Sequence, residues 1–247
     1  MERIHTFVNG KKISILKRDK TPIFYVHGSG CDATIWRLQL EEIGGFAIDL
    51  PNHGESDRVE ICSVDDYAYF VANVVKNISG KGVIAGHSLG GAIAQMVYLK
   101  YREVVSGLAL IGTGARLRVL PQVLDGLATR SHETAKLLAE MAFARKELIK
   151  QFADIFTKNA NLLLDDLRIC DKFDILEDYR TGKIRFEVPA IAIVGEKDFL
   201  TPVKYSKFFT DFGSEIAIVE NSGHMVMIEN PETLNEVLKN FLKKCSK

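Results

Sequence analysis

A serine flanked by glycines, Gly86-His87-Ser88-Leu89-Gly90, is the segment whose residue types and spacing best suit chemistry. It lies between an apolar run at 81–85 and an alanine-rich stretch at 91–101. A serine at such a strand-to-helix turn holds a strained backbone, and the glycines let the strand and the helix approach closely. The Ser88 hydroxyl is therefore expected to be presented as a nucleophile. An ordinary tight turn is the alternative interpretation.

A serine hydroxyl is a weak nucleophile, so Ser88 needs a neighbouring base and an acid that orients the base. Asp198 follows one apolar run, and His224 follows the next. If both runs are parallel strands, their loops leave the same carboxyl edge of the sheet that presents Ser88. We therefore predict a catalytic set of Ser88, Asp198 and His224. Glu196 is a weaker candidate for the acid.

Attack on a carbonyl would also need N–H donors for the negatively charged oxygen that forms. One expected donor is the backbone N–H of Leu89, because N–H groups are free at the start of a helix. The second is expected from the turn His27-Gly28-Ser29-Gly30. We predict that the Ser29 N–H serves there, with Gly30 as the alternative. A turn that merely ends a strand is the other interpretation.

The remaining histidines suggest no second site. His87 is expected to be structural, with its side chain pointing away from the nucleophile. His53 lies in a loop after an apolar run and is expected to shape the rim of a pocket. His5 and His132 belong to no motif.

The elements that must position these residues alternate along the chain. Apolar runs predict strands at residues 23–26, 46–50, 82–85, 107–111, 188–194 and 215–219, and helices are predicted at 33–42, 64–78, 91–101 and 231–242. A hairpin at 3–17 is predicted to turn at Asn9-Gly10. Runs that are apolar throughout suit a parallel sheet covered on both faces. Ser63 to Asp66 fits a helix-capping box.

Residues 115–187 interrupt this alternation with amphipathic helices. Apolar side chains recur there at helical spacing: Leu137, Leu138, Met141, Phe143, Leu148, Phe152, Ile155 and Phe156. They are expected to pack as a small helical subdomain, and some of them to face a substrate cavity.

The 247 residues, 47% of them hydrophobic, suffice for one large α/β domain. Basic and acidic residues balance at 32 each, which predicts a small-molecule partner, no nucleic acid and no stable membrane insertion. The cysteines, Cys31, Cys62, Cys170 and Cys245, lack the spacing of a zinc site or a disulfide framework. No apolar stretch approaches the ~18 residues of a membrane span, so a soluble, cytoplasmic protein is expected.

Taken together, the motifs resemble those of the α/β-hydrolase superfamily, in particular a serine esterase or lipase-like member with a helical lid. The matching segments are His27-Gly28, Asp49 to Ser56, Gly86 to Gly90, Asp198 and Gly223-His224. Asn52 stands where relatives often have glycine, which leaves the conformation of that loop open.

The resemblance implies an α/β fold with a mostly parallel eight-stranded sheet flanked by helices, and a lid inserted after the sixth strand. It also implies the triad of Ser88, Asp198 and His224. The expected division is a core domain at 1–114 and 188–247 and a lid at 115–187.

A serine nucleophile argues against haloalkane dehalogenases and epoxide hydrolases of this superfamily, which use aspartate. We expect a carboxylesterase that cleaves esters of short to medium acyl chains through an acyl-enzyme, without metal or organic cofactor. Alternatives with the same triad are a monoacylglycerol or lysophospholipid lipase, a carbon–carbon bond hydrolase, a prolyl-type aminopeptidase and a perhydrolase. A ligand-binding, receptor-like protein on this fold is an alternative of a different class.

Overall fold

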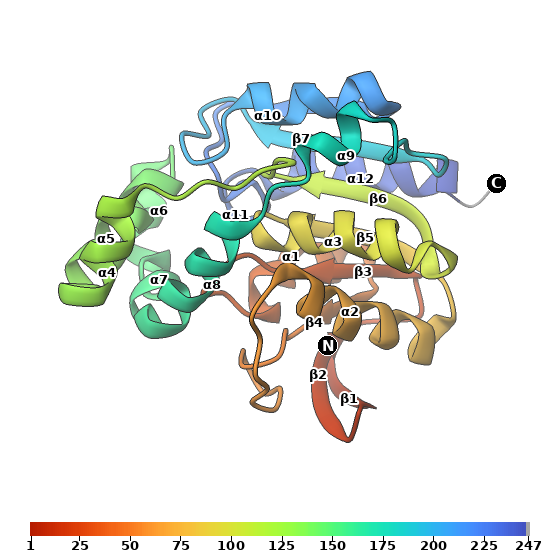
Figure 1. Cartoon of the computed structure of the whole chain (residues 1–247), viewed down its shortest axis with the longest axis horizontal. Coiled ribbons are helices and arrows are strands. Elements are labelled where there is room, and N and C mark those ends of the chain that lie inside the picture. Colours follow the sequence, from red (N-terminus) through yellow and green to blue (C-terminus); the bar gives the residue numbers. More distant parts are fainter. Residues whose placement is uncertain (246–247) are drawn as a thin grey trace.

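The structure, a computed structural model, describes residues 1–245, without the side chains of residues 151 and 152. The expectation for Phe152 therefore lies outside the described side chains. Eight strands form one sheet in the order β1-β2-β4-β3-β5-β6-β7-β8 (Figure 1). The strands are β1 (Glu2–Val8), β2 (Lys11–Lys17), β3 (Ile23–Val26), β4 (Phe46–Ile48), β5 (Gly82–His87), β6 (Val105–Ile111), β7 (Ala190–Gly195) and β8 (Glu215–Val219).

The sheet is mostly parallel, as predicted. β1 and β2 form the antiparallel hairpin, and β2 pairs antiparallel with β4. From β4 to β8 every neighbouring pair is parallel. At the hairpin turn Asn9 and Gly10 have φ angles of 50° and 73°, the left-handed values that a type I′ turn requires.

Helices cover both faces of the sheet. Outside the segment between β6 and β7 they are α1 (Arg37–Ile43), α2 (Val64–Ser79), α3 (Leu89–Lys100), α10 (Val203–Phe208), α11 (Val226–Glu229) and α12 (Pro231–Cys245). Helices α2 and α3 lie on one face, and α1 and α12 on the other (Figure 1). The predicted capping box starts α2, where Ser63 and Asp66 cap each other.

The strand β3 shows why the central runs are apolar at every residue. Phe24 and Val26 point into the core beside α2 and α3, whereas Ile23 and Tyr25 point into the core on the opposite face. Both sides of a central parallel strand are covered, so no position is left for a polar side chain.

The last strand departs from that pattern. Ile216 and Ile218 of β8 are 36% and 44% exposed. β8 is an edge strand that pairs only with β7 among the described strands, so its outer face is not covered as those of the central strands are.

Residues between β6 and β7 form the predicted run of helices. They are α4 (Pro121–Thr129), α5 (Ser131–Ala142), α6 (Lys146–Phe152), α7 (Asp154–Thr157), α8 (Ala160–Lys172) and α9 (Leu176–Arg180). Helices α4 to α8 gather beside the end of the sheet at which β6 finishes (Figure 1). This is the edge where a nucleophile after β5 would lie. No helix in residues 1–245 is both long enough and apolar enough to cross a membrane.

Asn52 takes the backbone conformation that glycine would allow. Its φ angle is 74°, in the left-handed region. Its side chain both donates to the Val59 carbonyl at 2.9 Å and accepts from the Val59 N–H at 2.8 Å. Asparagine tolerates this region better than most residues do, so the loop keeps its turn.

Candidate active site

Ser88 lies in the sharp turn between β5 and α3. Its φ and ψ angles are 53° and −114°, a strained conformation for a residue with a side chain. Four hydrogen bonds hold the backbone there. The Ser88 N–H donates to the Ile111 carbonyl at 2.9 Å, and the Ser88 carbonyl accepts from the N–H groups of Gly91 and Ala92 at 2.9 and 3.2 Å and from the Thr113 hydroxyl at 2.8 Å. The surroundings thus maintain a strain that places the side chain at the carboxyl edge of the sheet.

The glycines of the motif are required by close backbone approach. A Cβ atom added to Gly86 would collide with the carbonyl oxygen of Gly90, and one added to Gly90 would collide with the carbonyl oxygen of Val26. Both obstacles are backbone atoms rather than flexible side chains. An added Cβ would therefore push α3 away from β5 or from β3.

We expect Gly86→Ala to lower the free energy of unfolding by about 3 kcal/mol, because an overpacked backbone contact must be relieved by movement of β5 or α3. Urea unfolding followed by circular dichroism measures this. Gly80→Ala is the matched control: Gly80 has a φ angle of 73° but nothing within 4 Å of an added Cβ. A cost for Gly86→Ala no greater than for Gly80→Ala would contradict the collision.

Asp198 and His224 come together from the loops after β7 and β8. His224 Nδ1 lies 2.9 Å from Asp198 Oδ2, and the Asp198 side chain is fully buried. Glu196, the other acidic candidate, is exposed, and it accepts a hydrogen bond from the Asn221 N–H at 3.3 Å. The geometry therefore pairs the histidine with Asp198.

Asp198 is held by its own loop. Its Oδ1 accepts from the N–H groups of Leu200 and Thr201 at 2.9 and 2.8 Å, and its Oδ2 also accepts from the Thr201 hydroxyl at 2.8 Å. Burial alone would raise the pKa of Asp198, but the neighbouring His224 and these hydrogen bonds lower it overall. The carboxylate stays ionised at neutral pH. Sequence reasoning missed Thr201, whose place three residues after the aspartate is the signal of such a turn.

The loop that carries His224 is tied to the inserted helices. The His224 N–H donates to the Ala142 carbonyl, at the end of α5, at 2.8 Å. Glu229 of α11 accepts from the Gly223 N–H at 2.7 Å and from the Ala144 N–H at 2.7 Å. Burial raises the pKa of Glu229. No sequence motif marked Glu229, because its partners are up to 85 residues away.

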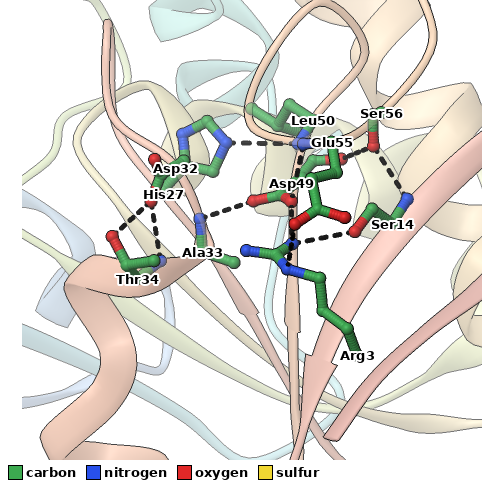
Figure 2. Close-up of polar contacts among 10 residues, drawn as sticks. All are labelled: Arg3, Ser14, His27, Asp32, Ala33, Thr34, Asp49, Leu50, Glu55 and Ser56. Carbon is green, nitrogen blue, oxygen red and sulfur yellow. Dashed lines mark hydrogen bonds and ion pairs between the residues drawn. The ribbon is translucent and has the colours of Figure 1, made fainter.

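The turn after β3 is fixed to the core at both ends. The Leu50 N–H donates to His27 Nε2 at 3.1 Å, and the Ala33 N–H donates to Asp49 Oδ1 at 2.8 Å, as Figure 2 shows. Asp49 is itself paired with Arg3. Burial, and then the neighbouring His53, lower the pKa of His27 to about 4, so this imidazole is neutral and its Nε2 is an acceptor.

Within this turn the two proposed N–H donors differ. The Gly30 N–H donates to Asp166 Oδ2 at 2.8 Å, so it is already engaged. No hydrogen bond from the Ser29 N–H occurs among residues 1–245. Of the two, only the Gly30 N–H is therefore engaged within the described chain.

His87 is buried, and its Nε2 lies 3.0 Å from the His224 carbonyl oxygen, to which it donates. Burial and the neighbouring His224 lower its pKa well below the usual value. The His87 ring also borders the cavity beside Ser88, so it does not point wholly away, as the sequence suggested.

His53 does not lie at a pocket rim, which corrects the expectation. It is 1% exposed and is not among the described residues that line the cavity. Its Nε2 is 2.9 Å from Asp166 Oδ2. The loop after β4 folds inward because its polar groups find buried partners there.

A cavity of about 240 Å³ opens onto these groups. Ser88, His224 and the turn residues Gly28 and Ser29 line one side. The rest of the lining is mostly apolar, although it includes Arg118 and Tyr205. Its apolar residues from the inserted helices are Leu138, Met141, Phe156, Leu163 and Leu167. Three of the apolar residues singled out in the sequence thus face the cavity, and Phe143, which is buried, does not line it. In the described part of the chain no cluster of three His, Cys, Asp or Glu side chains could hold a metal ion.

Comparison with known proteins agrees with this architecture. The profile of the alpha/beta hydrolase family matches residues 23–237. The chain is similar to a solved structure described as a thermophilic esterase, with 49% identity, a TM-score of 0.96 and coverage of 99% of this chain and 98% of that one.

Two curated relatives are more distant. The pimeloyl-[acyl-carrier protein] methyl ester esterase of Neisseria meningitidis is 24% identical over 90% of this chain and 93% of its own length. The Pseudomonas putida acetyltransferase component of an acetoin cleaving system is 26% identical over 91% of this chain, which spans only 64% of that protein. The match over most of the chain and the 49% identity to a solved relative carry the conclusion: this chain belongs to the alpha/beta hydrolase family.

Proposed function

We propose that the chain is a serine hydrolase of the carboxylesterase type, which cleaves esters of short to medium acyl chains. The observation that carries the proposal is one cavity bordered by Ser88, by His224 with its buried partner Asp198, and by the turn that contains Ser29. The esterase with 49% identity supports the same reaction class.

In this mechanism His224 takes the Ser88 proton while Ser88 attacks the ester carbonyl. Because Nδ1 of His224 is paired with Asp198, Nε2 is the nitrogen that serves as base. The N–H groups of Ser29 and Leu89 stabilise the charged oxygen. The protonated His224 then gives its proton to the departing alcohol, and water releases the acid from the acyl-enzyme by the same steps.

The size and lining of the cavity support the proposed acyl chain. Its volume of about 240 Å³ is below the range of roughly 300–1,000 Å³ for pockets that take drug-sized ligands. No carboxylate lines the described cavity, whereas a peptide amine would favour a cluster of carboxylates. Residues 115–187 serve as the lid, and 1–114 with 188–247 as the core domain.

The test is hydrolysis of p-nitrophenyl acetate, butyrate, octanoate and laurate. We expect the highest kcat/KM at butyrate or octanoate. Leu138→Ala should raise the laurate-to-butyrate ratio about tenfold, because burial of two more methylenes contributes about 0.8 kcal/mol each. Leu137→Ala is the matched control, since Leu137 lies on the same helix but is 55% exposed and does not line the cavity.

Two outcomes would contradict the proposal. If the protein hydrolyses no ester in the panel, the assignment as a carboxylesterase is wrong. An equal shift in Leu137→Ala and Leu138→Ala would show that the cavity does not hold the acyl chain.

A further inference from the structure

A buried carboxylate that plays no part in the triad lies behind the turn after β3. The side chain of Asp166, on α8, is fully buried. It accepts hydrogen bonds from the Gly30 N–H at 2.8 Å, from His53 Nε2 at 2.9 Å and from the Tyr67 hydroxyl at 2.8 Å. Burying a carboxylate costs several kcal/mol unless it is fully paired, and here it is.

The hydrogen-bond partners fix the charges in this cluster. His53 Nδ1 lies 2.8 Å from the Pro51 carbonyl oxygen, which can only accept, and Nε2 faces the Asp166 carboxylate. Nδ1 therefore carries a proton, and beside an ionised Asp166 Nε2 carries one too. Burial alone would lower the pKa of His53, but Asp166 raises it overall. The imidazolium and the carboxylate form a buried ion pair.

One face of α8 packs against Ser29 and Gly30 of the turn. Leu163, Asp166 and Cys170 share this face, because residues three and four apart are neighbours on a helix. A Cβ atom added to Gly30 would lie 3.0 Å from Leu163 Cβ, and Cys170 Sγ lies 3.5 Å from the Ser29 hydroxyl. The inserted helix thus contacts both residues that could offer the second N–H donor.

The centre of the turn has few other restraints besides the Gly28 carbonyl, which accepts from His27 Nδ1 at 2.9 Å. His27 and Ala33, the anchors that Figure 2 shows, stand at its two ends. Between them Gly28 and Gly30 leave the backbone free to adopt several conformations, and Gly30 has a φ angle of 68°. Two N–H groups of the turn have described acceptors. The Cys31 N–H donates across the turn to the Gly28 carbonyl, and the Gly30 N–H donates to Asp166.

We propose that Asp166 is a positioning residue for the oxyanion turn: by holding the Gly30 N–H it orients the Ser29–Gly30 peptide and keeps the adjacent Ser29 N–H directed at the reacting carbonyl. The proposal rests on the proposed function. It assigns α8 a role in positioning the active site, and this role does not depend on the other inserted helices. The restraint should affect kcat rather than substrate binding, because the oxyanion forms only as Ser88 attacks the carbonyl.

The experiment compares Asp166→Ala with Tyr67→Phe. Asp166→Ala is expected to lower kcat about 10²-fold, as loss of one oxyanion donor does, with little change in KM. Asp166→Asn should recover much of that loss, because its amide oxygen can still accept from Gly30 while its NH₂ donates to the Tyr67 oxygen. Tyr67→Phe removes one hydrogen bond from the same carboxylate but leaves Gly30 engaged, so kcat should stay within about threefold of wild type.

Stability is measured beside activity, by urea unfolding of each variant. A purely structural role predicts that kcat follows the free energy of unfolding in all three variants. The proposal is overturned if Asp166→Ala keeps kcat within about threefold, if its KM rises as much as kcat falls, or if Tyr67→Phe loses as much kcat. If Asp166→Ala does not fold, Asp166→Asn decides, with an expected loss of about fivefold in kcat at unchanged KM, because an amide oxygen is a weaker acceptor than a carboxylate. An equal loss of kcat in Tyr67→Phe overturns the proposal.

Labelling with a fluorophosphonate separates this proposal from the proposed function. The reagent phosphonylates an activated serine and releases fluoride, whatever the natural substrate. If the wild type is labelled but hydrolyses no ester, the ester assignment fails and the labelling rates of the Asp166 and Tyr67 variants still test the turn. If the wild type is not labelled either, both proposals fail.

Discussion

Replacement of Ser88 by alanine is expected to lower kcat for p-nitrophenyl butyrate about 10⁶-fold, as removal of the nucleophile does in other serine hydrolases. The substitution removes only the hydroxyl. The hydrogen bonds that hold the elbow involve the Ser88 backbone, through Ile111, Gly91 and Thr113, and alanine keeps them. Folding should therefore be intact, and substrate should still bind in the cavity. Steady-state kinetics and a thermal unfolding scan measure both.

The matched control is Ser206→Ala. The Ser206 hydroxyl on α10 is buried and has no hydrogen-bond partner among the described residues, so its removal should leave kcat unchanged. A Ser88→Ala variant that kept more than about a tenth of the wild-type rate would rule out covalent catalysis by this residue.

Replacement of Asp198 by asparagine is expected to lower kcat about 10⁴-fold. The Asp198 Oδ1 accepts two backbone N–H groups, of Leu200 and Thr201, so the amide oxygen of asparagine must take that place. The NH₂ group then faces His224 Nδ1 and donates to it. This selects the tautomer with the proton on Nε2, the nitrogen that must accept the proton of Ser88.

Glu196→Gln is the control, because Glu196 lies in the same loop and is exposed. It should change kcat by less than about threefold. A large loss in Glu196→Gln together with an active Asp198→Asn would transfer the acid role to Glu196. The kcat values of both variants across pH 6 to 9, measured with the same ester, make the comparison independent of one assay pH.

The sequence predicted the fold well where local rules govern it. The runs around Ile23 and Gly82 are apolar at every position, and that pattern is found almost only in strands covered on both faces. Asn9-Gly10 and the capping box at Ser63 are backbone conformations encoded by neighbouring residues. The nucleophile turn belongs partly to the same class, because Gly86 is needed for its contact with Gly90 within one strand, turn and helix, whereas Gly90 is needed for its contact with Val26 of β3.

Local sequence rules did not predict the roles of Asp166, His53 and Glu229. Asp166 pairs with residues 136 and 113 positions away, and Glu229 with a residue 85 positions away. One signal was present: Asp166 lies at a buried position of α8, between Leu163 and Cys170 on the same face. A carboxylate on the apolar face of a helix needs a buried partner, although the sequence did not say which.

By itself, then, the sequence determined the order of strands and helices along the chain, the strained turn at Ser88, and the candidate acid and base that would act with Ser88. Each of these depends on residues close together in the chain or on the common carboxyl edge of a parallel sheet. Only the tertiary structure decided which acid contacts His224, which N–H of the turn after β3 remains free, and which residues of the inserted helices face the cavity. Those outcomes depend on how α5 and α8 dock on the core, and docking is set by contacts between residues far apart in the chain.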